Sequence, residues 1–530
     1  MQHKITVGTV LLTALTLSSA DIWFPNYRQS APFARSLARN SVSPSRRDVS
    51  SASGDMMFAT EEKNTAWQNH VDKIISKGIL KMSLDIEQKL RAESGPNENV
   101  LFSPVSIASA LALVLLGSGG RTFQETARVM GVATGVEIAS QPHLIHSQFG
   151  RLLDKFSYAH LISRSNIPVA EAAKKAYDGL ELTAASGVFV QDGFTVAPTF
   201  RRVATSAYHS DVVSVDFIEG GEGPSKLING WVSDRTQGHI RDILPWRIAP
   251  AWTRVIFATA LYFNGAWKIP FPVEGTAPRP FYLGSLPKYV NGFVVKPSNP
   301  KPGDVIQVPM MANIGEFPFL KRPDLGFRAF GLPYGLNDST SPVATMYFVI
   351  PNADGNSTGV SGLRNMLNRL KYTDLEAIVT DSQTRPLIVS VPKMKLSSST
   401  SLKQAVSSLG LPSLFDPATA NLSGIFEESV TSRSVSPSNY RRGGSNSSSR
   451  KGAQKIRELG PLFADDIRHR VELEVTELGT VAAAATSVAL SRDGGTHVTI
   501  RADRPFLFFV HHVPSNLILF WGSIVRPPVA

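Results

Sequence analysis

The stretch "ADRPFLFFVHHVPSNLILFWGSIVRP", residues 502–527, contains two runs rich in Val, Ile, Leu and Phe. Turn-forming Pro, Ser and Asn residues separate the two runs, and apolar runs bounded in this way are typical of β-strands. The stretch therefore predicts two strands close to the C-terminus. His511 and His512 lie beside the first run, where we expect them to have a structural role.

Similar runs occur upstream, in "SGVFVQ", "DVVSVDF", "VIFATALYF", "ATMYFVI", "PLIVSVPKM" and "RVELEVTEL". Helical segments lie among them. Apolar residues at Ile75, Ile79, Met82, Ile86 and Leu90 have the spacing of one helix face. Because helices and strands do not alternate strictly, the sequence predicts an α+β fold rather than a doubly wound sheet.

The N-terminal residues 1–20, "MQHKITVGTVLLTALTLSSA", have the pattern of a secretory signal peptide. Lys4 supplies the basic region, an apolar run follows, and small residues lead to Ala20. Residues 21–65 are polar and irregular, which predicts a flexible N-terminal extension. No other stretch reaches the roughly 18 apolar residues of a membrane span, so we expect a soluble, secreted, extracellular protein.

The chain of 530 residues contains no cysteine, which excludes disulfides, zinc fingers and thiol catalysis. An exported chain of this kind must be held together by its hydrophobic core. Four Asn-X-Ser/Thr sequences are candidate glycosylation sites. They are Asn337, Asn356, Asn421 and Asn446.

The net charge of +11 would attract polyanions. In an extracellular protein the polyanion is more often a glycosaminoglycan than a nucleic acid, and the alternative is that the charge only serves solubility. Residues 430–460 form a Ser/Gly-rich basic segment, which predicts an inserted, solvated loop. Its candidate polyanion contacts are Arg433, Arg441, Arg442, Arg450, Lys451, Lys455 and Arg457.

A search for catalytic motifs finds no H-E-x-x-H metal site and no G-x-x-x-x-G-K-[ST] phosphate loop. His143 and His146 have helical spacing, but no third metal ligand is evident near them. We therefore expect neither a metal nor an enzymatic activity.

Six blocks, in order, resemble the signature blocks of serpins. They are "NVLFSPVSIASALALVLLGSGGRT", "LINGWVSDRTQGHIRDIL", "ATALYFNGAWKIPF", "VPMMANIGEF", "ELGTVAAAATS" and the C-terminal stretch quoted first. The resemblance runs from Ala66 to Pro527 and implies a serpin domain over residues 66–530. It implies a fold with three β-sheets, about nine helices and an exposed reactive-centre loop. Most members of the family are suicide inhibitors of serine proteases.

The resemblance places the hinge and reactive-centre loop at residues 477–502. Glu477, Gly479 and Thr480 match the hinge of inhibitory members, whereas Leu478 and Val481 depart from it. The alanine run alone would favour a helix or a linker. Small hinge residues suit insertion of the loop as a strand, because they can slide between two strands without a clash. They are Ala482, Ala483, Ala484, Ala485 and Thr486.

Two reactive bonds are candidates. Arg492–Asp493 would suit a trypsin-like protease, whose specificity pocket holds an acid that pairs with arginine. Leu490–Ser491 would suit an enzyme like chymotrypsin or elastase. Insertion of about 14 residues would carry an attached protease some 46 Å, at roughly 3.3 Å per residue.

The family's shutter, where its main sheet opens, maps to Ser103, Ser106 and His469, with Ser186 in place of the usual Asn. The breach tryptophan maps to Trp267. We therefore expect a monomeric inhibitor that forms a covalent complex with an extracellular serine protease. It would need no cofactor, and a heparin-like glycosaminoglycan is a candidate modulator. The alternatives are a non-inhibitory carrier or chaperone of the same family and a polyanion-binding surface protein.

Overall fold

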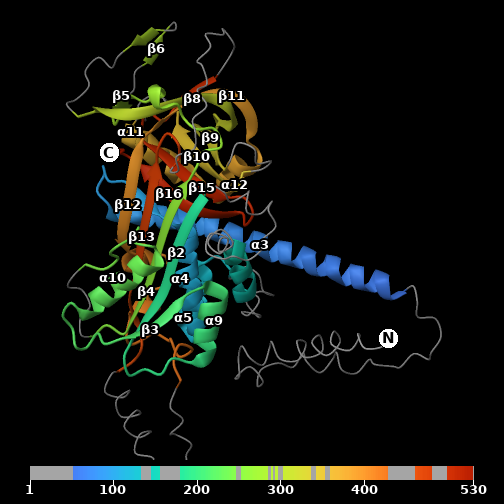
Figure 1. Cartoon of the computed structure of the whole chain (residues 1–530), viewed down its shortest axis with the longest axis vertical. Coiled ribbons are helices and arrows are strands. Elements are labelled where there is room, and N and C mark those ends of the chain that lie inside the picture. Colours follow the sequence, from blue (N-terminus) through green and yellow to red (C-terminus); the bar gives the residue numbers. More distant parts are fainter. Residues whose placement is uncertain are drawn as a thin grey trace, which may run out of the picture.

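The computed structural model of the protein is shown in Figure 1. It describes residues 52–132, 145–155, 180–245, 252–284, 288–290, 293–295, 303–335, 342–352, 359–427, 460–479 and 498–528. The predicted signal peptide, the basic segment at 430–460 except its last residue, and residues 480–497 of the predicted hinge and reactive-centre loop at 477–502 lie outside these ranges.

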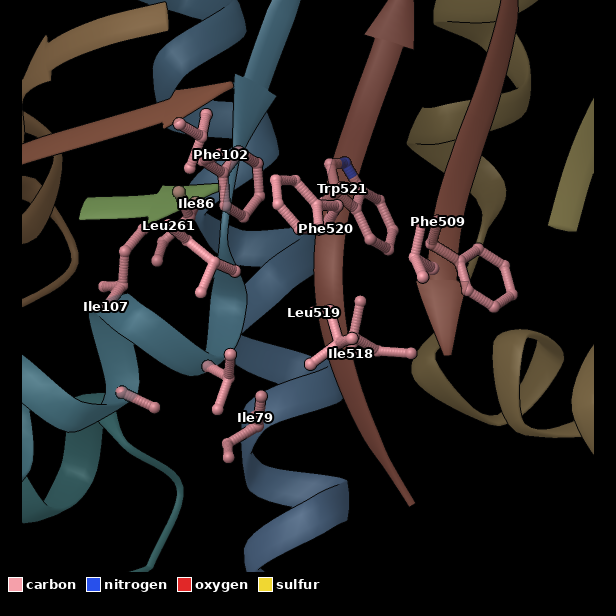
Figure 2. Close-up of a cluster of buried hydrophobic side chains, with 14 of the residues drawn as sticks. Ile79, Ile86, Phe102, Ile107, Leu261, Phe509, Ile518, Leu519, Phe520 and Trp521 are labelled. Carbon is pink, nitrogen blue, oxygen red and sulfur yellow. The ribbon is translucent and has the colours of Figure 1, made fainter. Parts of the chain in front are cut away.

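The two runs of the C-terminal stretch form the antiparallel strands β15 (Phe506–His512) and β16 (Leu517–Ile524), so the predicted pair is confirmed. Every residue of both strands is buried. The Trp521 ring stacks on Phe102 and Phe509, with ring centroids 6.2 and 6.3 Å apart. Figure 2 shows these side chains in one cluster with apolar residues from two helices. The stretch is therefore the centre of the core.

The histidines at the end of β15 have the structural role expected of them. His511 Nε2 lies 2.8 Å from Asn516 Oδ1, and His512 Nδ1 lies 2.8 Å from Ser515 Oγ. Both rings are buried, so the two histidines hold the turn between β15 and β16.

β15 and β16 belong to a nine-stranded sheet. In spatial order its strands are β1 (Val100–Phe102), β16, β15, β10 (Ala344–Pro351), β9 (Phe327–Tyr334), β8 (Val305–Arg322), β11 (Gln383–Pro392) and β14 (Val498–Arg501), and β5 (Ala277–Tyr282) pairs with β8 off this path. A separate two-stranded ribbon consists of β6 (Lys288–Val290) and β7 (Phe293–Val295).

A five-stranded sheet runs along the long axis of the molecule (Figure 1). Its order is β12 (Met394–Ser401), β13 (Ala464–Val475), β4 (Val255–Gly265), β2 (Leu180–Gln191) and β3 (Asp211–Val215). Alternate residues of β4 face two different clusters: Phe257 and Leu261 join the main core, and Ile256 and Ala260 join a second one. Both faces of the sheet are therefore covered.

Each of the described α-helices has an apolar face that packs against one of these two clusters or against a neighbouring helix. They are α3 (Ala52–Glu93), α4 (Pro104–Gly117), α5 (Gly120–Val129), α9 (Pro198–Tyr208), α10 (Gly223–Arg235), α11 (Gly359–Arg369), α12 (Tyr372–Thr380) and α13 (Lys403–Ser408), with short 3-10 turns η3 (Val273–Gly275) and η4 (Ser413–Phe415). Residues 145–155 are helical as well. The predicted α+β class is confirmed. Among the described residues, no helix is long and apolar enough to cross a bilayer.

The helix predicted from the apolar residues between Ile75 and Leu90 is confirmed as α3, but it extends well beyond these residues toward the N-terminus. It begins at Ala52, so residues 52–65, which we expected to belong to a flexible extension, are helical. This part of the chain is rich in Ala, Met and Glu, which have high helix propensity. Propensity therefore extends the helix beyond the residues that the core requires.

Candidate functional site

The end of β13 leads into a tight turn that only a glycine can close. Gly479 N donates to Thr476 O at 3.3 Å, and Gly479 has a φ of 82°. A Cβ atom at this position would lie 2.0 Å from Gly265 O. Because of its left-handed backbone and this close approach, residue 479 must be glycine.

Trp267, the predicted breach residue, holds this turn against the end of β4. Its ring is buried, stacks on Tyr334 at a centroid distance of 4.2 Å, and donates from Nε1 to Thr476 O at 2.8 Å. The backbone of Phe271 donates to Glu477 O at 2.7 Å. The first turn of the predicted hinge is therefore bound to the core of the molecule.

The carboxylate of Glu477 adds two side-chain contacts. Thr276 Oγ1 donates to Glu477 Oε1 at 2.9 Å, and Lys393 Nζ lies 2.9 Å from Glu477 Oε2. Burial acting alone would raise the pKa of Glu477, but hydrogen bonds from Lys393, from its own backbone amide and from Thr276, with the charge of Lys393, outweigh burial and hold the pKa below its ordinary value. Glu477 is therefore an ionised anchor of the turn after β13.

A second polar cluster lies under the sheet. Ser103 N donates to His469 Nε2 at 2.8 Å, and His469 Nδ1 lies 3.0 Å from Thr259 Oγ1. Ser103 also caps α4, because its Oγ accepts from Ser106 N at 3.2 Å. His469 thus connects the start of α4 to β4 and β13.

The imidazole of His469 is neutral in this cluster. Burial lowers the pKa of His469 to about 3. Because Nε2 accepts from the Ser103 amide, the ring proton lies on Nδ1 and is donated to Thr259. Protonation of Nε2 would remove an acceptor that the start of α4 uses.

Ser186 lies in the same row of the sheet but has a different partner. The strand registers place Ser186 beside Thr259, and Thr259 beside His469. The hydroxyl of Ser186 accepts from Ser210 Oγ at 2.7 Å. Its side chain is therefore held by Ser210, near α9, and makes no described hydrogen bond to His469.

Sequence reasoning missed several partners in these clusters. Thr259 carried a signal, since it is a polar residue within the apolar run "VIFATALYF". Thr276, Lys393 and Ser210 carried none, because each lies in a segment that only the fold brings to the site.

Most of the predicted loop residues lie outside the described part of the chain. They are Thr480, Ala482, Ala483, Ala484, Ala485, Thr486, Leu490, Ser491, Arg492 and Asp493. The basic residues from Arg433 to Arg457 also lie outside it, as do Asn337, Asn356 and Asn446. Asn421 is described and exposed, and its Oδ1 accepts from Ser423 Oγ at 2.8 Å.

One pattern of hydrolases has the wrong structural context here. The sequence G-x-S-x-G occurs at residues 355–359, and it would mark a nucleophile elbow if it followed a strand of a hydrolase sheet. β10, the strand before it, pairs antiparallel with both of its neighbours. The strand before this sequence therefore differs from the parallel strand that leads into a nucleophile elbow. Within the described ranges, no group of three or more His, Asp or Glu side chains is placed to hold a metal ion.

Comparison with known proteins adds independent findings. Residues 77–527 match the family model "Serpin (serine protease inhibitor)". Serine protease inhibitor 28Dc of Drosophila melanogaster is 30% identical over 518 residues, which cover 95% of this chain and 86% of that protein. Antithrombin-III of Homo sapiens is 26% identical over 457 residues, covering 86% of this chain and 82% of that protein.

A solved structure has the same fold. Human thyroxine-binding globulin matches with a TM-score of 0.63 and 20% identity, over 86% of this chain and 99% of that one. At this level of identity the likeness shows the fold alone.

Proposed function

The chain belongs to the serpin family, and from this premise we propose that it is a secreted suicide inhibitor of a trypsin-like serine protease. The protease serine attacks the carbonyl carbon of Arg492, an ester forms, and the amine of Asp493 leaves. Residues 480–492 then enter the five-stranded sheet before water can hydrolyse the ester.

The observation that carries this proposal is the pairing of β4 with β13. The two strands are parallel neighbours, whereas β12 with β13 and β2 with β4 are antiparallel. A segment that leaves β13, reverses and enters between β13 and β4 would run antiparallel to both. One parallel pair would be replaced by two antiparallel ones, which are slightly more stable per residue.

The hinge turn supports the same reaction. Gly479 reverses the chain at the end of β13, beside the end of β4. The residues that follow are Thr, Val and alanines, which would enter the sheet with little steric resistance. Around ten new hydrogen bonds at roughly 0.5–1.5 kcal/mol each would make the inserted form more stable by on the order of 10 kcal/mol.

We also propose secretion, from the predicted signal peptide, and glycosylation at the exposed Asn421. The seven Lys and Arg residues between Arg433 and Arg457 support a heparin-like polyanion as a modulator. The basic segment at residues 430–460 precedes β13 in the sequence, and the predicted hinge follows β13.

The test is to mix the protein with trypsin, thrombin and elastase and to look for adducts that survive SDS. We expect an adduct with a trypsin-like enzyme, and mass spectrometry should locate the cleaved bond at Arg492–Asp493. The variant Thr480→Arg should be cleaved without trapping the enzyme, because a guanidinium that must enter the sheet interior is costly to bury.

The matched control is Thr384→Arg, which adds the same charge at an exposed position of β11. It should form the adduct as the unchanged protein does. An adduct that survives in Thr480→Arg would refute insertion of the loop as the trapping step.

A further inference from the structure

A pocket of about 300 Å³ opens on the part of the nine-stranded sheet formed by β5, β8, β11 and β14. These strands lie at the upper end of the molecule in Figure 1. The volume is at the lower end of the range of small-molecule sites. No role assigned above uses this pocket.

The strand registers place six of the lining residues in two rows. Ala312, Ser390 and Arg501 lie side by side on β8, β11 and β14, and Ile314, Ile388 and Thr499 form the next row. Because residues two apart on a strand share a face, both rows lie on the same side of the sheet. The pocket therefore combines an aliphatic floor with polar groups at one edge.

Three polar side chains of the pocket, those of Ser390, Arg279 and Arg501, have no hydrogen-bond partner in the described part of the chain, whereas Asn313 is satisfied by Ile269 O, Pro270 O and Ile314 N. Ser390 is only 5% exposed, and its hydroxyl has no hydrogen-bond partner among the described residues. Arg279 and Arg501 line the pocket and are exposed, and neither guanidinium group forms a hydrogen bond or ion pair with the described part of the chain. A buried hydroxyl without a partner is costly, so a ligand that reached it would remove that cost.

The charges select the ligand. Arg279 and Arg501 bring two positive charges and Glu274 one negative charge, which leaves the lining with a net charge of +1. A single anionic head group matches this balance, and arginine binds carboxylate-like groups through two parallel hydrogen bonds. The aliphatic floor favours a ligand with an apolar body over an inorganic ion.

We propose that this pocket is a binding site for a small organic anion. Its carboxylate or sulfonate contacts Arg501 and Arg279, and its apolar body lies on Ile314 and Ile388. The site touches the anchors of both ends of the loop. Gly275 lies next to Thr276, which binds Glu477, and β14 lies at the C-terminal end of the predicted loop range of 477–502.

The probe is 2-naphthoate, titrated into the intact protein by isothermal calorimetry, with the neutral 2-naphthamide as the comparison ligand. We expect one saturable site for 2-naphthoate and at least tenfold weaker binding of the amide. Arg501→Gln and Arg279→Gln should each weaken 2-naphthoate binding about tenfold, since each removes a charge-assisted hydrogen bond.

The matched control is Arg385→Gln. Arg385 is exposed on β11 and lies outside the pocket lining, so its loss removes the same charge from the same sheet. The affinity of the Arg385→Gln variant for 2-naphthoate should equal that of the unchanged protein.

Three outcomes would overturn the site: no binding of 2-naphthoate, equal binding of the amide, or full affinity in both pocket variants. Thermal melts of all three variants check that they are folded. No protease takes part in these measurements, so their failure would leave the proposed inhibition untouched, and failure of inhibition would leave the site untouched.

Discussion

At the scale of single residues, two positions fix the geometry of β13 and of the turn that precedes the predicted loop. Gly479 closes the turn after β13, and its missing side chain makes room for Gly265 O. His469 connects β13 to the start of α4 through the amide of Ser103. Gly479 contributes its missing side chain, and His469 contributes two ring nitrogens, one that accepts from Ser103 N and one that contacts Thr259 Oγ1.

Replacing Gly479 with alanine should destabilise the protein more than its backbone conformation alone explains. The left-handed φ costs an L-residue about 1–2 kcal/mol, and the overlap with Gly265 O adds about 1–3 kcal/mol. Thermal melts measure the sum.

Gly238→Ala is the control for Gly479→Ala. Gly238 has a φ of 81°, close to the 82° of Gly479, but a Cβ atom there meets nothing within 4 Å. The melting temperature should therefore fall less in Gly238→Ala. Equal shifts in the two variants would contradict the steric argument.

His469 should make stability depend on pH. Its pKa is about 3 in the folded protein and about 6.5 in the unfolded chain. Because the unfolded chain binds the proton first, the contribution of His469 is complete above pH 6.5 and is lost as the pH falls toward 3. Between pH 6.5 and 5 the loss amounts to about 2 kcal/mol.

The measurement compares melting temperatures at pH 8, 6.5 and 5 at one scan rate. His469→Gln should be less stable at pH 8 and should lose less between pH 6.5 and 5. His511 and His512 are present in both proteins, so the difference isolates His469. If the pH curves of the two proteins are parallel, His469 binds protons equally in the folded and the unfolded states, and the prediction is wrong.

At the scale of elements, a segment after α10 crosses the line where β4 meets β13. We call residues 236–244 the strap. His239 stacks on Tyr262 of β4 at 3.8 Å and lies 3.2 Å from Glu181 of β2. Asp242 forms an ion pair with Arg470 of β13. The strap is therefore fixed on both sides of the boundary between β4 and β13, where an inserted strand would separate the two strands.

Asp242→Asn should speed insertion. A new strand would move β13 away from β4 by about 4.8 Å, which the Asp242–Arg470 pair opposes. Uncleaved protein should lose at most about 1 kcal/mol of stability, because the pair is close to the surface. The readout is the rate at which a synthetic peptide of residues 480–492 enters the intact protein, followed on native gels.

Asp234→Asn is the control, since Asp234 is exposed on α10 and makes no described ion pair. It should leave the rate of peptide insertion unchanged. If Asp242→Asn does the same, the strap does not restrain the sheet.

At the scale of the whole molecule, the two large sheets contain different parts of the protein. The nine-stranded sheet contains the C-terminal strands and the centre of the main core, shown in Figure 2. The five-stranded sheet contains the parallel pair of β4 and β13, and the predicted loop follows β13 in the sequence. The five-stranded sheet is thus the one that would gain a strand under the proposed mechanism, at its parallel pair of β4 and β13.

Cleavage at Arg492–Asp493 should therefore raise the stability of the whole protein. A gain on the order of 10 kcal/mol corresponds to a rise of about ten degrees or more in melting temperature. Protein clipped by trace protease, and purified from any adduct, is compared with intact protein in thermal melts.

Clipped Thr480→Arg should show no such rise, which separates strand insertion from the cut itself. An unchanged melting temperature in the clipped parent protein would show that no strand is added.

The sequence by itself determined the strands, the α+β class and the family resemblance. Composition and alternation are local properties, so runs such as Phe506–Val510 identify strands without knowledge of their partners. The need for glycine at 479 was also visible as part of a motif. The shutter residues were named from the resemblance, but their bonds were not.

Only the tertiary structure decided which groups meet. Thr259 and His469 are 210 positions apart, Ser103 and His469 are 366 apart, and Thr276 and Glu477 are 201 apart. The parallel pairing of β4 with β13 and the crossing of the strap over it also come from the fold. Such contacts depend on how distant strands are laid side by side, and no local periodicity records that arrangement.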